Sequence, residues 1–268
     1  MYCPKVEDIK VKRTPPGKIL VTVTEEKAIF YADLYGVDYK KVPLNSDFSI
    51  TPDDYFASGK TVVIANPNAP TGLALTVLQV EEILKANKDD VVIIDEAYVD
   101  FGAESCVPLT KKYNNLIVVM TYSKSRSLAG GRLGFAIAHK DLISDLNTIK
   151  YSTNPYNINR LTMAAGIASL EDADYYINCN KNTAEVREYT KAELIKRGFT
   201  LTDSKANFLF AKSNKIGGEE YYLSLKSKGV LVRHFKNEKI KDFVRITIGT
   251  KKQMDILLAK TDEILSEV

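Results

Sequence analysis

Four short runs of β-branched and aliphatic residues divide the first half of the chain: Ile19–Thr24, Thr61–Ala65, Val91–Ile94 and Leu116–Met120. Each run has the length and composition of a buried strand. Between the second and third runs, apolar residues recur at helical spacing over Thr76–Asn87. Because a strand, a helix and a second strand in succession favour parallel pairing, we expect an α/β fold with a mostly parallel central sheet flanked by helices.

The second half of the chain changes from strands to helices and back. A fifth apolar run, Leu133–Ala138, precedes a stretch predicted to be mostly helical from Pro155 to about Arg197, with one break near Leu170–Ala173. After it, the sequence predicts strands at Asn207–Ala211, Val230–His234 and Phe243–Ile248, a helix at Glu219–Lys228 and a closing helix from Lys251. We therefore expect a large α/β domain over residues 1–170, and an interdomain helix with a small C-terminal α+β domain over residues 171–268.

Composition and charge exclude several classes of protein. The 37 Lys and Arg residues nearly balance 34 Asp and Glu residues, which argues against a nucleic-acid partner. Cys3, Cys106 and Cys179 are widely separated, so neither a disulfide framework nor a metal site is expected, and a reducing cytoplasm is the expected compartment. No apolar run approaches the roughly 20 residues of a membrane span, so no membrane partner is expected.

The first motif is the loop from Asn66 to Gly72, Asn-Pro-Asn-Ala-Pro-Thr-Gly, between a predicted strand and a predicted helix. Two prolines and a glycine restrict its backbone, which is expected to hold the amides of Asn66 and Asn68 where a ligand could meet them. The alternative is a rigid turn without a binding role.

The second motif, Asp95-Glu96-Ala97-Tyr98, follows the apolar run Val91–Ile94. Ligands bind at the carboxyl ends of parallel strands, where a carboxylate could face a protonated ring nitrogen and the Tyr98 phenol could reach the same ring. The alternative is a helix cap or a loop residue.

The third motif places Lys124 just beyond another predicted strand. Its amine could form an imine with a carbonyl compound, while the hydroxyls of Thr121 and Ser123 and the guanidinium of Arg132 could hold a phosphate. The alternative is an ordinary surface lysine.

These motifs are persuasive in combination, because Asn66, Asp95 and Lys124 follow successive strands at intervals of 29 residues. Pyridoxal phosphate needs a lysine for its aldehyde, a carboxylate for its ring nitrogen and an anion site for its phosphate. The sequence therefore predicts a pyridoxal-phosphate site, and no metal site.

From about Phe30 onward the chain resembles the fold type I, class II aminotransferases, and among them the histidinol-phosphate aminotransferases. The resemblance implies that Asn66 and Tyr98 bond the oxygen at C3 of the cofactor and that Asp95 pairs with the ring nitrogen. It also implies that Lys124 is the Schiff-base residue and proton carrier. Thr121, Ser123 and Arg132 would bind the cofactor phosphate.

Two strand arginines resemble the substrate-binding arginines of the same family. The resemblance implies that Arg245 binds the substrate carboxylate or its equivalent and that Arg233 meets the substrate phosphate. The alternative for both is pairing with surface acids. Tyr156 and Asn157 resemble residues near the active site of the family.

The resemblance fails at the N-terminus. Members of the branch carry roughly another 80 residues there, which supply a substrate-covering arm, a tyrosine lent to the neighbouring subunit and a glycine-led turn at the phosphate. Residues Met1–Thr24 offer no counterpart, and Glu25 falls near the position of the aromatic residue that stacks on the cofactor ring.

The leading hypothesis is a homodimeric aminotransferase that acts on an amino-phosphate, histidinol phosphate, with the 2-oxo acid 2-oxoglutarate in histidine biosynthesis. One alternative is a shortened, catalytically silent relative. Another is a related pyridoxal-phosphate enzyme such as a phosphothreonine decarboxylase.

Overall fold

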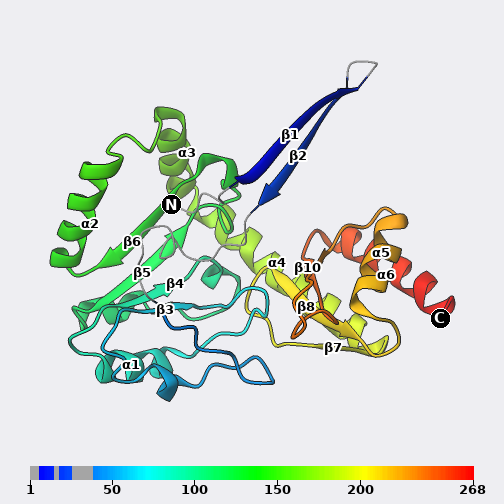
Figure 1. Cartoon of the computed structure of the whole chain (residues 1–268), viewed down its shortest axis with the longest axis horizontal. Helices are drawn as coiled ribbons and strands as arrows, with labels where there is room; N and C mark the ends of the chain where they lie inside the picture. Colours follow the sequence, from blue (N-terminus) through cyan, green and yellow to red (C-terminus); the bar gives the residue numbers. More distant parts are fainter. Residues whose placement is uncertain (1–5, 15–17, 26–38) are drawn as a thin grey trace. The chain divides into compact units, whose positions relative to one another are not determined.

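The computed structural model describes residues 6–14, 18–25 and 39–268, the first two ranges through their backbone. The chain divides into two compact units, Met1–Pro43 and Leu44–Val268. In the first unit, β1 (Val6–Thr14) and β2 (Lys18–Glu25) form an antiparallel hairpin (Figure 1). Strand β2 confirms the strand predicted at Ile19–Thr24, whereas β1 was not predicted. The prediction for the Glu25 side chain and that for Cys3 lie outside the described parts.

The larger unit begins with a sheet in the strand order β3-β4-β5-β6. These strands are β3 (Val62–Ala65), β4 (Val92–Asp95), β5 (Leu116–Thr121) and β6 (Gly134–Ala138). The first three are parallel and β6 runs antiparallel beside β5. The predicted mostly parallel sheet is confirmed, with one antiparallel strand at its edge.

Helix α1 (Val77–Ala86) covers part of this sheet. Thr76 starts the helix in a capping box with Gln79, in which each side chain bonds the other residue's backbone N–H. The apolar face of the helix is buried through Val80, Ile83 and Leu84, which join the buried strand residues in one core cluster. The sheet and α1 thus form a rigid base beneath the strand ends.

Three helices follow the first sheet: α2 (Lys140–Thr153), α3 (Arg160–Glu171) and α4 (Ala173–Lys196). The predicted helix start at Asn154-Pro155 is wrong, because α2 already ends there and α3 begins after Asn159, whose side chain accepts the N–H of Thr162. The ring of Pro155 disfavours the helical conformation for Asn154 and so ends α2 there, and the Asn159 side chain caps the start of α3. The predicted break is confirmed at Asp172, between α3 and α4.

A second, antiparallel sheet has the order β7-β8-β10-β9. Its strands are β7 (Phe199–Leu201), β8 (Phe208–Ser213), β9 (Arg233–His234) and β10 (Val244–Thr247), accompanied by helices α5 (Gly218–Ser227) and α6 (Lys251–Ser266). The predicted α+β character is confirmed, although β7 was not predicted and β9 is shorter than expected. The boundary between residues 170 and 171 stays a prediction.

Short 3-10 helices occupy several loops: η1 (Pro52–Tyr55), η2 (Val99–Phe101), η3 (Val107–Lys111) and η4 (Ala129–Gly131).

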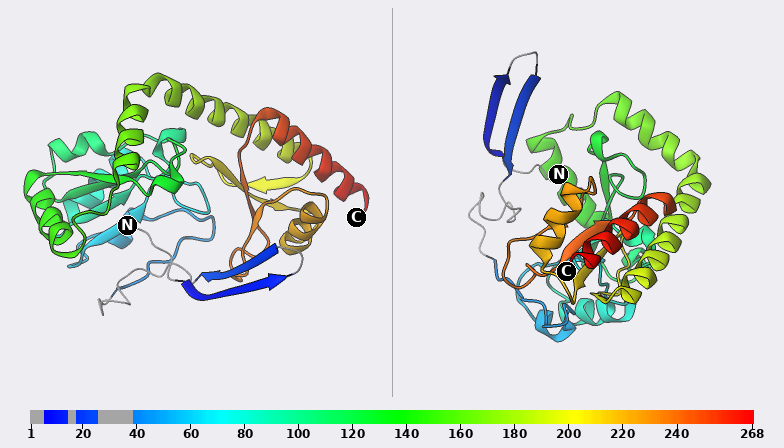
Figure 2. Two further views of the ribbon diagram at one scale, coloured as in Figure 1. Left: turned by 90° about the horizontal axis from the view of Figure 1, so that it is seen from above. Right: turned by 90° about the vertical axis from the view of Figure 1, so that its right-hand side faces the viewer.

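Long α4 runs from the region of the first sheet to the second (Figure 2). Its buried Arg187 donates to the carbonyl oxygens of Phe101 at 2.7 Å and Ala206 at 2.9 Å. This guanidinium therefore ties η2 to the loop before β8.

The loop from Asn66 to Gly72 forms a second tie within the larger unit. The Thr202 hydroxyl donates to the Thr71 carbonyl oxygen, and the Lys205 N–H donates to that of Gly72 at 2.8 Å. Gly72 has φ +74°, and a Cβ atom there would overlap the Ser204 side chain and lie 2.9 Å from its Cα. The contact thus requires glycine both for conformation and for space.

We predict that Gly72→Ala lowers the free energy of unfolding by roughly 2–4 kcal/mol, because the left-handed conformation and the collision with Ser204 both oppose a methyl group. Gly59→Ala is the matched control, since Gly59 has φ +61° but no atom within 4 Å of its added Cβ. It should lose about 1 kcal/mol. Urea unfolding of both variants checks the difference, and equal losses would contradict the collision.

Candidate functional site

The carboxyl ends of β3, β4 and β5 lie side by side and carry the predicted site residues. In the parallel register, Ala65 is level with Asp95, and Asp95 with Val119. The Asn66 N–H donates to the Asp95 carbonyl oxygen at 2.8 Å, and the Glu96 N–H to that of Val119 at 2.8 Å. The loops that follow the three strands therefore start from one edge of the sheet.

Lys124, Tyr98 and Asp95 lie together at this edge. The Lys124 Nζ is 5.3 Å from the centroid of the Tyr98 ring, and the Lys124 side chain is exposed. Burial raises the pKa of Asp95, whereas the hydrogen bond from the Ala97 N–H, at 3.0 Å, and the positive charge of Lys124 lower it. An amine, a phenol and a partly buried carboxylate thus adjoin one another.

Asn66 is buried, and its side chain bonds the backbone of Leu75: Nδ2 donates to the carbonyl oxygen at 3.2 Å, and Oδ1 accepts the N–H at 2.7 Å. The prediction that the backbone amides of Asn66 and Asn68 face a ligand is wrong. They donate to the carbonyl oxygens of Asp95 and Leu73, because strand register and the turn use both groups. The Asn66 Nδ2 carries a second hydrogen, which it can still donate to another acceptor.

Thr121 and Ser123 adjoin one another, with the Thr121 hydroxyl donating to the Ser123 hydroxyl at 2.9 Å and accepting the Ser123 N–H at 3.0 Å. The Leu133 carbonyl oxygen accepts the Tyr122 N–H at 3.0 Å, which brings the turn at Arg132 beside the same segment. Arg132 is exposed in the left-handed conformation, and its Nη1 donates to the Ala129 carbonyl oxygen at 3.1 Å.

The two predicted substrate arginines face each other across neighbouring strands. Arg245 of β10 is directly opposite Arg233 of β9. The Arg245 Cζ is 5.1 Å from the centroid of the Phe208 ring, and the Phe208 and Tyr98 rings are 5.2 Å apart and nearly perpendicular. Neither arginine forms an ion pair with an acid within residues 39–268. Ring contacts therefore connect Lys124, through Tyr98 and Phe208, to Arg245.

Phe208 was missed by the sequence analysis, since an apolar residue in a strand gives no signal of such contacts. Tyr156 and Asn157, by contrast, are exposed in the loop between α2 and α3, and no contact in the described part of the chain joins them to Lys124.

Glu96 follows Asp95 in the chain and is buried, and the sequence predicted no role for it. Its carboxylate accepts the Ser105 hydroxyl at 2.6 Å and the Cys106 N–H at 2.5 Å. Burial raises the pKa of Glu96. Burial and the neighbouring Glu96 raise the pKa of the Cys106 thiol to about 12, so this thiol stays protonated at neutral pH.

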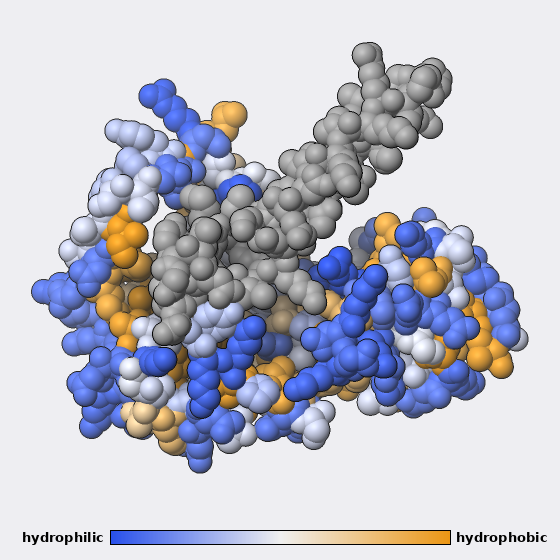
Figure 3. Space-filling model, viewed as in Figure 1, coloured by the Kyte–Doolittle hydropathy of each residue, from blue (hydrophilic) through white to orange (hydrophobic). Residues whose placement is uncertain are grey.

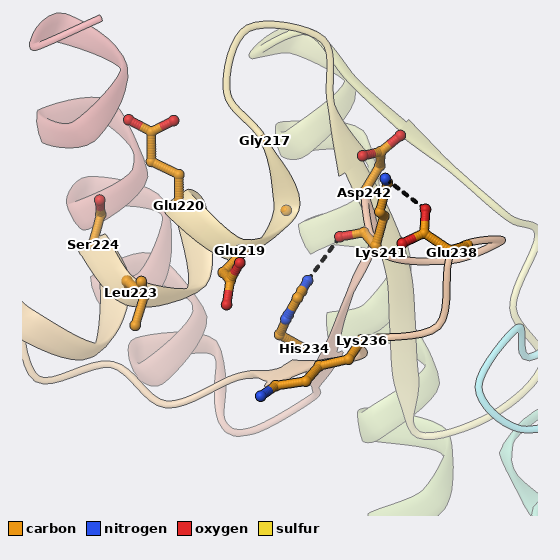
Figure 4. Close-up of a pocket in the computed structure, with 11 residues that line it drawn as sticks. Gly217, Glu219, Glu220, Leu223, Ser224, His234, Lys236, Glu238, Lys241 and Asp242 are labelled. Atoms are coloured by element: carbon orange, nitrogen blue, oxygen red, sulfur yellow. Dashed lines mark hydrogen bonds and ion pairs between the residues drawn. The ribbon is translucent and has the colours of Figure 1, made fainter.

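A separate pocket of about 760 Å³ lies beside the second sheet (Figure 4). It is lined by residues of α5 and of the segment around β9, among them Gly217, Glu220, His234, Lys236 and Lys241. The His234 Nε2 lies 2.7 Å from the Lys241 carbonyl oxygen. The pocket contains none of the predicted site residues, so the candidate site remains at the strand ends.

None of the described helices combines the length and apolar character needed to cross a membrane. Among the described residues, no three His, Cys, Asp or Glu side chains cluster so that they could hold a metal ion.

We predict that the free energy of unfolding of Glu96→Gln increases relative to that of the parent chain as pH rises. Because the folded-state pKa of Glu96 is raised, the folded state holds its proton longer, and parent stability falls as pH rises above the ordinary value of 4.5. The variant has no carboxyl group at position 96, so its stability lacks this dependence on pH. Urea unfolding between pH 4 and 7 checks the difference, and a difference that does not vary with pH would contradict it.

Glu81→Gln is the control of opposite sign. The pKa of Glu81 is lowered to about 2 by hydrogen bonds from Lys112, Tyr113 and Lys85. The stability that ionised Glu81 contributes is present above pH 4.5 and lost as pH falls toward 2. This variant should therefore be less stable than the parent chain at neutral pH and approach it in acid.

Known proteins identify the family. Residues 29–260 match the family Aminotransferase class I and II. A histidinol-phosphate aminotransferase from Brachyspira hyodysenteriae is 51% identical over 236 residues, which cover 88% of this chain and 67% of the relative. One from Lactococcus lactis subsp. cremoris is 46% identical, covering 88% of this chain and 66% of the relative. The chain thus spans about two thirds of the length of these curated relatives.

Solved structures agree with the fold. The histidinol-phosphate aminotransferase from Clostridium acetobutylicum superimposes with a TM-score of 0.81 at 27% identity, covering 88% of this chain and 74% of that chain. That from Sinorhizobium meliloti, solved in complex with pyridoxal-5'-phosphate, has a TM-score of 0.68 at 24% identity and covers 77% of this chain and 57% of that chain. With the sequence matches above, the chain belongs to the aminotransferases of class I and II.

Proposed function

We propose that this chain carries out, or forms part of an enzyme that carries out, transamination of histidinol phosphate with 2-oxoglutarate in histidine biosynthesis. The relatives named above support the substrate class. The observation that carries the proposal is the close approach of the Lys124 amine to Tyr98 and to the charge of Asp95. These three groups suit a cofactor that carries both an aldehyde and a basic ring nitrogen.

The residues at the strand ends fit pyridoxal phosphate. Bound there, the cofactor supplies an aldehyde that accepts amines and a ring that withdraws electrons from the substrate. Lys124 Nζ would hold the cofactor and would move a proton at the substrate carbon that bears the amine. The Asp95 carboxylate would keep the ring nitrogen protonated. The Tyr98 hydroxyl and the Asn66 Nδ2 would donate to the oxygen at ring C3.

The remaining cations and hydroxyls suit the anionic groups of cofactor and substrates. Thr121, Ser123 and Arg132 would bind the cofactor phosphate, as paired hydroxyls and a guanidinium can. Arg245 binds the substrate carboxylate or its equivalent, and Arg233 binds the substrate phosphate. The cross-strand pairing of two arginines supports this assignment, because like charges opposite each other are destabilising unless an anion lies between them.

We predict that the chain mixed with pyridoxal phosphate develops the visible absorbance of a lysine-bound cofactor and that Lys124→Ala does not. Lys140→Ala, an exposed lysine at the start of α2, is the control and should retain the band. Absorbance spectroscopy makes the comparison. An unchanged band in Lys124→Ala would refute the assignment of Lys124.

Product analysis separates the candidate activities. The proposal requires glutamate to form when histidinol phosphate and 2-oxoglutarate are supplied together. Carbon dioxide released from phosphothreonine would instead indicate a decarboxylase. Absence of both products, with the cofactor bound, would favour the catalytically silent alternative.

We also propose that the chain forms a homodimer in the cytoplasm. The buried face of α3 is formed by Thr162, Gly166 and Ser169, whereas Leu161, Met163, Ile167 and Leu170 are more than half exposed. Apolar residues are also visible at the left of Figure 3, in the region of α2. An outward apolar face of this kind suits a protein partner, and symmetric self-association is the commonest arrangement. The exposed free thiol of Cys179 is consistent with a reducing compartment.

We predict that the parent chain elutes as a dimer in size-exclusion chromatography and that Leu161→Asp, at a side chain that is 85% exposed, shifts it to a monomer. A buried interface tolerates an unpaired carboxylate poorly. Leu78→Asp on α1, where Leu78 is 71% exposed, is the control and should leave the dimer intact. A monomeric parent chain would contradict the proposal.

A further inference from the structure

Phe208 lies where the two halves of the candidate site meet. It is the first residue of β8 and is 2% exposed. Its ring is 5.2 Å from that of Tyr98 at an interplanar angle of 82°, and its centroid is 5.1 Å from the Arg245 Cζ. One buried ring therefore contacts both the proposed cofactor side and the proposed substrate side.

Arg245 lies over this ring. Its Nε is buried and meets no hydrogen-bond partner within the described ranges. The residue directly opposite on β9 is Arg233, whose charge repels it. A guanidinium over an aromatic face is attracted by the ring quadrupole, and this attraction strengthens as water is excluded.

The ring itself is held firmly. The Ser204 hydroxyl donates to the Phe208 carbonyl oxygen at 2.6 Å, and Phe208 pairs with Thr247 of β10. Since the side chain is also buried, close packing restricts its rotation. The backbone thus fixes the ring, and the ring offers a fixed surface to the guanidinium.

We propose that Phe208 is a positioning residue that holds the Arg245 guanidinium at a set distance from Tyr98 and thereby selects substrates with an anionic group. The selectivity part of this inference rests on the function proposed above. Phe208 does not touch the reacting atoms, and it acts through Arg245.

The test compares Phe208→Leu with Phe199→Leu. Both remove a buried ring from the same sheet, but the Phe199 ring contacts Tyr221, and none of the ring contacts of the described residues joins it to an arginine. In Phe208→Leu, phenylglyoxal should modify Arg245 severalfold faster, as measured by peptide mass spectrometry. The dissociation constant for 2-oxoglutarate, measured by calorimetry with pyridoxamine phosphate present, should rise about 5- to 30-fold. Phe199→Leu should change neither quantity.

A double-mutant comparison separates positioning from general loosening. In an Arg245→Ala background, Phe208→Leu should no longer weaken 2-oxoglutarate binding, because its effect passes through Arg245. The inference would be overturned if Phe208→Leu still weakened 2-oxoglutarate binding in the Arg245→Ala background. It would also be overturned if Phe208→Leu alone changed neither the rate of Arg245 modification nor the affinity for 2-oxoglutarate. Faster modification with unchanged affinity would overturn the selectivity part. If the parent chain binds no 2-oxoglutarate while the modification rate still rises, the proposed function fails and the positioning role stands.

Discussion

The parallel register of β3, β4 and β5 is the constraint on which the candidate site depends. It sets Ala65 level with Asp95, and Asp95 with Val119, so that three loops leave the sheet at one edge. The core beneath them, formed by the strands and α1, prevents one strand from sliding past the next without exposing apolar side chains. Lys124 is therefore a neighbour of Tyr98 and Asp95 although it follows a different strand.

The contacts between the first sheet and the C-terminal sheet complete the arrangement. Gly72 contacts the Ser204 segment, and Phe208 touches both Tyr98 and Arg245. The Gly72–Ser204 and Tyr98–Phe208 contacts each join residues more than a hundred positions apart. The distance between the proposed cofactor groups and the proposed substrate arginines thus depends on these contacts as well as on the two sheets.

Much of the fold could be predicted because buried strands have a recognisable composition and parallel strands direct polar residues to one edge. The same rule identified Asn66, Asp95 and Lys124 as candidate site residues. Other features depend on partners that a local pattern does not reveal. Strand β7 has three residues and exists through pairing with β8, and Phe208 is apolar like its neighbours. The backbone amide of Asn66 was assigned wrongly because the adjacent strand uses it.

The two hydrogen bonds that Arg187 donates to main-chain carbonyl oxygens have a consequence for how this sequence can vary. The guanidinium binds the carbonyl oxygens of residues 101 and 206, and every type of amino acid provides such an oxygen. The link therefore fixes the path of the main chain without requiring a particular side chain at either acceptor. Substitutions at positions 101 and 206 therefore leave both acceptors in place, whereas position 187 requires a long, branched donor.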